Sequence, residues 1–323
     1  MFETFGDNDK KRDLTPPFQP IFISKATHYE EKVLRWHSVG VKRDVLFYQF
    51  HTAHDEDSCR MDMLPDACIN ILFECSPDDP KALLSGLSLK PSELKLKPDT
   101  TYFGFKPFSD RGFKRSKLPL PDLVNRDIDL LELLPDAQEM LLQVANSEGL
   151  DEQIRSFDEY ARKHMVESEY QPSFVDFFTY LLCSSQGTAD LNEMQQMTGY
   201  SNRYCRERFK GDHGISPKQY SNIIRFQRTL KQLMRSEDGN LTALAADNGY
   251  YDQAHFIHDF KKFAKYAPSR FRKLYQRSDK PTAPLPEEEV SNDKRGIAIA
   301  DPIPSDDDAS DANPKGNGLT DIG

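Results

Sequence analysis

The sequence predicts an α+β protein with a β-rich N-terminal half and an all-α C-terminal half. Three observations support this class: short apolar runs broken by turn residues up to about residue 118, helical spacing after Leu120, and a helix-turn-helix pattern that occurs twice between residues 188 and 263. A chain of 323 residues exceeds the usual span of one hydrophobic core, so more than one domain is expected.

The N-terminal half is predicted to form a barrel or sandwich of short strands. Four apolar or alternating runs are typical of strands: Val45 to Phe50, Cys68 to Phe73, Leu83 to Leu89 and Tyr102 to Phe105. Proline, aspartate and glycine residues separate these runs, as in strands that are joined by tight turns. We expect an N-terminal arm over residues 1–28 and a β-rich sensor domain over residues 29–118.

After Leu120 the apolar residues follow the period of an α-helix. They form three groups: Leu130 to Leu134, Met140 to Val144, and Ile154 with Phe157, Tyr160 and Ala161. We expect a helical connector over residues 119–170, followed by a working domain over residues 172–277.

The net charge of −10 conceals a basic segment. Residues 188–277 contain 16 Lys and Arg against nine Asp and Glu, a net charge of +7, whereas residues 278–323 contain four against eleven, a net charge of −7. Phosphate contacts need Lys and Arg, so the basic segment is the candidate nucleic-acid binder. Residues 278–323 have no aromatic residue and are expected to form a disordered acidic tail.

Two segments of the C-terminal third share their special positions. The recurring residues are Leu191, Gly199, Phe209 and Pro217 in the first copy, and Leu241, Gly249, Phe260 and Pro268 in the second. The first two positions are offset by 50 residues and the last two by 51, so the second copy has one extra residue between its glycine and its phenylalanine. Two copies of one structural unit explain this repeat.

Each copy is predicted to be a short helix, a tight turn and a second helix. The first helix buries Leu191 and Met194, or Leu241 and Leu244, and the glycine supplies the left-handed conformation that ends it. Ser201 or Asp252 caps the second helix, whose inner face is Cys205 and Phe209, or Phe256 and Phe260. Such a unit places its second helix in the major groove of DNA.

A third helix is predicted between the copies. Ser216 caps it, Pro217 begins it, and it ends before Glu237. Some seventeen residues at ~1.5 Å each make a rod of roughly 25 Å, which can hold two recognition helices about one DNA turn, ~34 Å, apart on the same face.

These motifs resemble the C-terminal DNA-binding domain of the AraC/XylS family of bacterial regulators. The resemblance covers residues 172–277. Its strongest stretches are Gly214-Ile215-Ser216-Pro217-Lys218-Gln219-Tyr220 with Arg225-Phe226-Gln227-Arg228, Leu241-Thr242-x-Leu244-Ala245 with Gly249-Tyr250-Tyr251-Asp252-Gln253-Ala254-His255-Phe256, and Phe260-Lys261-Lys262-Phe263 with Pro268. The first copy departs from the family pattern, with Gln195 where a small residue is usual and Cys205 where leucine is usual.

The resemblance implies a sequence-specific transcription regulator in the cytoplasm of a bacterium. Its implied partners are double-stranded promoter DNA, RNA polymerase and a second copy of the chain.

The N-terminal half is similar to a poorly characterised, cupin-like sensor domain that precedes such modules. The similar stretches are Leu64-Pro65-Asp66-Ala67-Cys68-Ile69-Asn70-Ile71-Leu72-Phe73 and Phe103-Gly104-Phe105-Lys106-Pro107. The similarity implies a small β-barrel-like fold and an effector that these motifs do not identify.

The first recognition helix turns five polar residues outward: Asn202, Arg203, Arg206, Glu207 and Lys210. Arg203 and Arg206 are the best base readers, because a guanidinium can bridge guanine O6 and N7. Glu207 either accepts a hydrogen bond from a cytosine amine or pairs with Arg203 one helical turn away.

The second recognition helix offers Asp252, Gln253, Ala254, His255 and His258 near its start, with Lys261 and Lys262 near the DNA backbone. Gln253 suits adenine N6 and N7. We favour a groove-facing role for the two histidines over a metal site, because no third ligand accompanies them. The sequence gives no basis for choosing between phosphate contact and a structural role for Arg225, Arg228 and Lys218.

Two other functions are weaker interpretations. An enzyme would use the polar cluster of His51, His54, Asp55, Glu56 and Asp57, but a hydrated loop explains it better, and no Walker loop, GxSxG elbow or dinucleotide fingerprint is present. A helix-turn-helix adaptor that binds only proteins would not need Arg203, Arg206 and Gln253. We therefore expect no catalytic residues, no metal and no cofactor.

The remaining patterns favour a cytosolic protein with reduced thiols. Lys10, Lys11 and Arg12 lead into polar sequence rather than an apolar run, and no stretch approaches the roughly 18 apolar residues of a spanning helix. The five cysteines contain no CxxC pair. A thiol sensor made of Cys59, Cys68 and Cys75 is the alternative to three small buried side chains.

Overall fold

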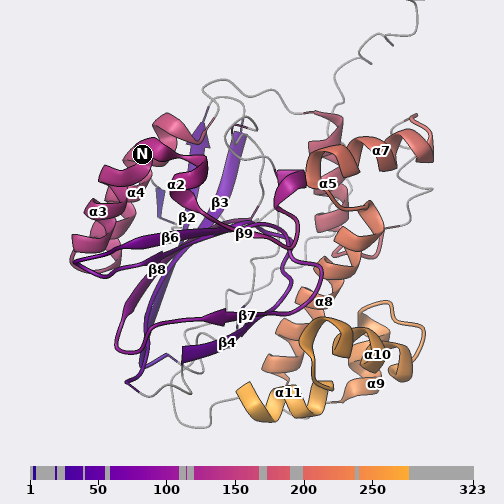
Figure 1. Cartoon of the computed structure of the whole chain (residues 1–323). Coiled ribbons are helices and arrows are strands. Elements are labelled where there is room, and N and C mark those ends of the chain that lie inside the picture. The colour runs from indigo at the N-terminus through magenta and orange to yellow at the C-terminus, as the bar shows by residue number, and fades with distance from the viewer. Residues whose placement is uncertain are drawn as a thin grey trace, which may run out of the picture. The chain divides into compact units, whose positions relative to one another are not determined.

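The computed structural model describes residues 3–4, 19, 26–38, 41–54, 59–108, 114, 120–166, 173–189, 199–236 and 240–275. A β-sheet part is followed by a helical part, which confirms the α+β class (Figure 1). The predicted acidic tail and the predicted helix around Leu191 and Met194 lie outside the described residues.

The described strands pair only with antiparallel neighbours, in a main sheet of seven strands and a second sheet of two. The order of the main sheet is β1 (Glu3–Thr4), β2 (His28–Ser38), β3 (Val41–His51), β8 (Thr101–Pro107), β5 (Asn70–Glu74), β6 (Lys81–Ser85) and β9 (Asp127–Asp129). The second sheet pairs β4 (Arg60–Met63) with β7 (Ser92–Lys95).

The four predicted runs correspond to β3, β5, β6 and β8, with shifted ends. The sequence did not predict β2, because charged residues interrupt its alternation and leave only Leu34 and Trp36 as buried apolar side chains of the part whose burial is described. β4, β7 and β9 are three or four residues long and largely polar, so they carry too few apolar residues for a period to be recognised.

Three helices follow the strands: α2 (Leu130–Leu133), α3 (Gln138–Asn146) and α4 (Leu150–His164). Phe157 of α4 is fully buried and packs its ring against aromatic rings of the three central strands, β3, β8 and β5. The ring centroid lies 4.6 Å from Phe105, 5.7 Å from Phe73 and 6.1 Å from Phe47. The segment predicted as a connector therefore packs on the sheet and contributes to its core.

The helical part contains six described helices: α5 (Phe174–Ser184), α7 (Asn202–His213), α8 (Pro217–Arg235), α9 (Leu241–Asp247), α10 (Gln253–Ala264) and α11 (Pro268–Tyr275). The predicted connecting helix is α8, and its start is as expected. Ser216 and Gln219 form a capping box, and Pro217 is the first helical residue. Figure 1 shows α8 running between α7 and the pair α9 and α10.

Among the described residues, no helix combines the length and the apolar character that crossing a membrane requires.

Replacement of Phe157 by alanine should lower the free energy of unfolding of the sheet part by about 3–5 kcal/mol, because it leaves a cavity among the aromatic rings. Trp36 is the single tryptophan and stacks on Phe105 at 5.2 Å, so its fluorescence during urea denaturation reports this core. Leu142→Ala is the control, since Leu142 is 40% exposed on α3 and its loss should cost less than about 1 kcal/mol. Equal losses for the two variants would contradict a core centred on Phe157.

Candidate nucleic-acid interface

Both copies of the repeat have the predicted turn and cap. Gly199 and Gly249 adopt φ angles of 73° and 66°, in the left-handed region that glycine enters without strain. The hydroxyl of Ser201 accepts a hydrogen bond from the Tyr204 amide, and the carboxylate of Asp252 accepts one from the His255 amide. The second helices of the two units are therefore α7 and α10.

α7 packs on the core through the two residues that the sequence predicts to be on its inner face. Cys205 and Phe209 are buried, and the Phe209 ring lies 5.7 Å from Phe178 of α5 and 5.4 Å from Tyr220 of α8. Arg203, Arg206, Glu207 and Lys210 are exposed, while Asn202 is half-buried at the first helical position. Because these four exposed residues are three or four positions apart, they share one face of α7.

Glu207 pairs with Arg203 along this face. The Arg203 Nε to Glu207 Oε1 distance is 3.0 Å, and the two side chains are 88% and 65% exposed. Of the two predicted roles for Glu207, the protein without DNA therefore shows the pairing with Arg203. An ion pair this exposed contributes little to stability, so Arg203 can leave it for DNA at small cost.

α10 follows the same plan, with Phe256 and Phe260 buried and every predicted DNA residue exposed: Asp252, Gln253, Ala254, His255, His258, Lys261 and Lys262. Thr242 of α9 donates a hydrogen bond of 2.9 Å to Gln253 Oε1. This contact fixes the side chain at the start of the helix. The amide oxygen has a second lone pair and the amide nitrogen two donors, so Gln253 can still pair with adenine N6 and N7.

The two histidines of α10 surround a carboxylate that sequence analysis did not consider. Asp259 lies 3.7 Å from His255 Nε2 and 3.9 Å from His258 Nδ1, and it accepts a hydrogen bond of 3.1 Å from Arg225 of α8. The Arg225 guanidinium also lies 4.5 Å from the centre of the Tyr250 ring. With its side chain 11% exposed, Arg225 therefore has a structural role.

In the described part of the chain, no group of three or more His, Cys, Asp or Glu side chains is arranged to hold a metal ion. His51 instead contacts Asp99 at 3.2 Å and Thr101 at 3.0 Å, while Asp55, Glu56 and Asp57 lie outside the described residues. Cys75 is not poised to react, because burial raises the pKa of its thiol to about 12.

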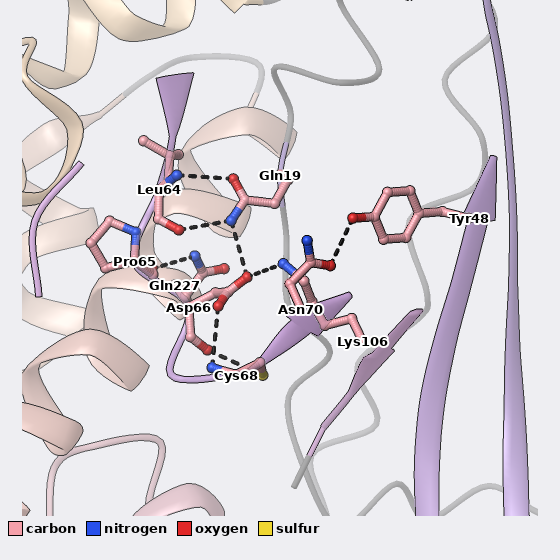
Figure 2. A network of polar contacts seen from close by, with 9 residues as sticks. All are labelled: Gln19, Tyr48, Leu64, Pro65, Asp66, Cys68, Asn70, Lys106 and Gln227. Carbon is pink, nitrogen blue, oxygen red and sulfur yellow. Dashed lines mark hydrogen bonds and ion pairs between the residues drawn. The ribbon is translucent and has the colours of Figure 1, made fainter. Parts of the chain in front are cut away.

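A buried polar network joins the sheet part to α8 (Figure 2). The Gln227 side chain of α8 donates a hydrogen bond of 2.7 Å to the carbonyl of Pro65, and both Asp66 and Gln227 are buried. Asp66 forms an ion pair with Lys106 of β8. Burial alone would lower the pKa of Lys106, but the charges of Asp66, Tyr48 and Cys68 more than offset this effect and raise it above its usual value.

Two further contacts connect the sheet part to the helix-turn-helix units. Asp62 of β4 forms an ion pair with Lys265, which caps the C-terminal end of α10, and its other oxygen lies 3.5 Å from the Tyr275 hydroxyl of α11. Gly214, at the end of α7, lies close to Pro121. A Cβ added to this glycine would stand 2.7 Å from the Cα of Pro121. Sequence analysis predicted none of these contacts, because they join residues that are far apart in the chain.

Comparison with protein-family models matches residues 194–274 to a helix-turn-helix domain. The matched range includes α7 to α10 and nearly all of α11. It confirms the helix-turn-helix domain that the repeat predicts. Comparison with curated proteins finds no match.

Three solved structures are similar at low identity. The C-terminal domain of AraT, a response regulator from Geobacillus stearothermophilus, is 22% identical over 35% of this chain and 93% of that chain, with a TM-score of 0.31. ToxT from Vibrio cholerae is 14% identical over 77% of this chain and 99% of that chain, with a TM-score of 0.36. CdpR, a transcriptional regulator from Pseudomonas aeruginosa, is 16% identical over 54% of this chain and 46% of that chain, with a TM-score of 0.29. These TM-scores are too low to support an argument. The assignment of a helix-turn-helix domain therefore depends on the family model and on the repeat.

Glu207→Gln should raise the affinity for a duplex of mixed sequence about three-fold at low salt, because it removes a negative charge from the α7 face and releases Arg203. The slope of log K against log salt should become steeper by about 0.9 if the released Arg203 contacts one more phosphate. Glu139→Gln, an exposed carboxylate on α3, is the charge-matched control and should change neither quantity. A lower affinity together with a changed base preference would instead assign Glu207 to base reading.

Proposed function

We propose that this protein is a transcription regulator of the AraC/XylS type, whose helix-turn-helix domain reads promoter DNA with α7 and α10. The observation that carries the proposal is the pair of capped helices, each of which packs on the core through its buried residues and presents an exposed polar face. Arg203 and Arg206 would read guanine, and Gln253, held by Thr242, would read adenine. The other predicted residues would position the helices: Asn202, Glu207, Lys210, Asp252, Ala254, His255, His258, Lys261 and Lys262.

We propose that the sheet part senses an effector or a protein partner. It would act on the DNA-binding domain through the three contacts described above. Pro65 contacts α8, Asp62 contacts α10 and α11, and the chain around Pro121 contacts the end of α7. A change in the sheet part that moved these segments would alter how α7 and α10 approach DNA. The contacts thus provide a physical route between the two functions.

The resemblance to AraC/XylS regulators suggests the setting of this function. We place the protein in the bacterial cytoplasm, as a regulator without enzymatic activity. A second copy of the chain and RNA polymerase are its proposed protein partners. Analytical ultracentrifugation that finds a monomer at working concentrations would remove the proposed homodimer.

Selection of bound duplexes from a random DNA pool, at one fixed salt concentration, tests the DNA-binding step. Wild type should enrich a site with two half-elements about one helical turn apart. Arg203→Ala should relax the sequence of one half-element and Gln253→Ala that of the other, each by about 1–3 kcal/mol of discrimination against a wrong base. Salt is held constant because backbone affinity varies steeply with it.

The controls for this selection separate two kinds of failure. Lys95→Ala in the exposed strand β7 removes a positive charge far from both recognition helices in the sequence and should leave the selected site unchanged. A folded wild type that enriches nothing, with or without cell extract as a source of effector, would favour the adaptor function instead.

Asp62→Ala should loosen α11 without weakening the main sheet, because it removes the ion pair with Lys265 and the contact with Tyr275. We expect the amides of residues 268–275 to exchange hydrogen about two- to five-fold faster, as the loss of one partly exposed ion pair implies. The amides of β3 and β8 should be unaffected. Glu93→Ala is the control, since Glu93 lies opposite Asp62 in the two-stranded sheet and pairs with Arg60. Unchanged exchange in α11 would argue against this route between the two parts.

A further inference from the structure

The second helix-turn-helix unit contains one residue that has no counterpart in the first. One residue separates Gly199 from the cap Ser201, whereas two separate Gly249 from the cap Asp252. Tyr200 and Tyr250 both follow their glycine directly. The extra residue of the second turn is therefore Tyr251.

The two adjacent tyrosines of this turn have opposite environments. Tyr250 is buried, with its ring 5.3 Å from Phe256 and under the Arg225 guanidinium. Tyr251 is 92% exposed, the most exposed large apolar side chain among the described residues. In the first unit, Tyr200 stacks on Tyr204 at 4.7 Å and meets Phe174 at 4.9 Å, so its place corresponds to that of Tyr250. The core of the unit thus uses Tyr250 and leaves Tyr251 to solvent.

The backbone of Tyr251 is held in place although its ring is free. Its amide donates a hydrogen bond of 3.3 Å to Nδ1 of His255, which lies in the first turn of α10. Asp252, the next residue, is fixed as the cap of the same helix. The ring therefore projects into solvent from a constrained backbone position two residues before Gln253, so a contact made by it loses little backbone entropy.

We propose that Tyr251 is a specificity-determining residue whose ring packs on the 5-methyl group of a thymine beside the base that Gln253 reads. The N-terminal end of a recognition helix is the part that meets base edges, and apolar contact is the means by which thymine is distinguished in the major groove. A tyrosine ring gains apolar burial there that it lacks in the free protein. This inference rests on the proposed function, since it assigns a role within that DNA interface.

The test replaces thymine by deoxyuridine, one position at a time, in the half-element that Gln253→Ala relaxes. The replacement removes only the methyl group, so wild type should lose about four-fold in affinity at one position, the amount that one buried methyl group is worth. Tyr251→Ala should bind the dT and dU versions of that position equally. Tyr251→Phe retains the ring and should still distinguish them by about four-fold.

Ser201→Ala, in the first unit, is a control that weakens a cap without touching the second turn. It should leave the four-fold preference for dT intact. Retention of the preference in Tyr251→Ala, or a wild type that ignores every dU replacement in a site it has selected, would overturn the role of Tyr251 alone. A folded wild type that selects no site would overturn the proposed function itself.

Discussion

The helix α8 is the constraint on which the rest of the DNA-binding domain depends. Near its start, Tyr220 lies 5.4 Å from Phe209 of α7. Six residues further along, Phe226 lies 5.4 Å from Phe260 and 5.2 Å from Phe263 of α10. Each recognition helix is therefore packed on the same rod through its own aromatic contact. Because a packed interior does not deform smoothly, the distance between the two reading faces is set by this helix rather than by the turns.

The same helix also contacts the sheet part, and the contact is specific because buried polar groups make it. Gln227 follows Phe226 and donates to a buried carbonyl beside the Asp66 and Lys106 ion pair. A buried charge that loses its partner costs about 3–5 kcal/mol, so Asp66 must remain close to Lys106. The segment that contacts α8 is thereby held in one arrangement. Any signal that reaches it has to move the ion pair as a unit, which favours a discrete change over a gradual one.

The sequence predicted what local patterns encode and missed what tertiary contacts decide. Residues that define turns and caps, such as Gly249, Asp252 and Ser216, have roles that depend on neighbours a few positions away, so their spacing was sufficient. The roles of Arg225 and Gln227 depend on Asp259 and Pro65, which are distant in the chain. Thr242 and Tyr251 lay within quoted motifs, but only the burial and contacts of their side chains separate them from ordinary surface residues.

The acidic residues beside the reading faces explain how a chain with a net charge of −10 can present a surface suited to phosphate. Glu207 is paired with Arg203, Asp259 with Arg225, and Asp252 accepts a backbone hydrogen bond at the positive end of the α10 dipole. Each carboxylate thus has a partner within the protein, and only Glu207 uses a cation of the outer faces, Arg203. Arg206, Lys210, Lys261 and Lys262 remain exposed there. The sign of the local field near DNA follows from this pairing, and the whole-chain charge does not predict it.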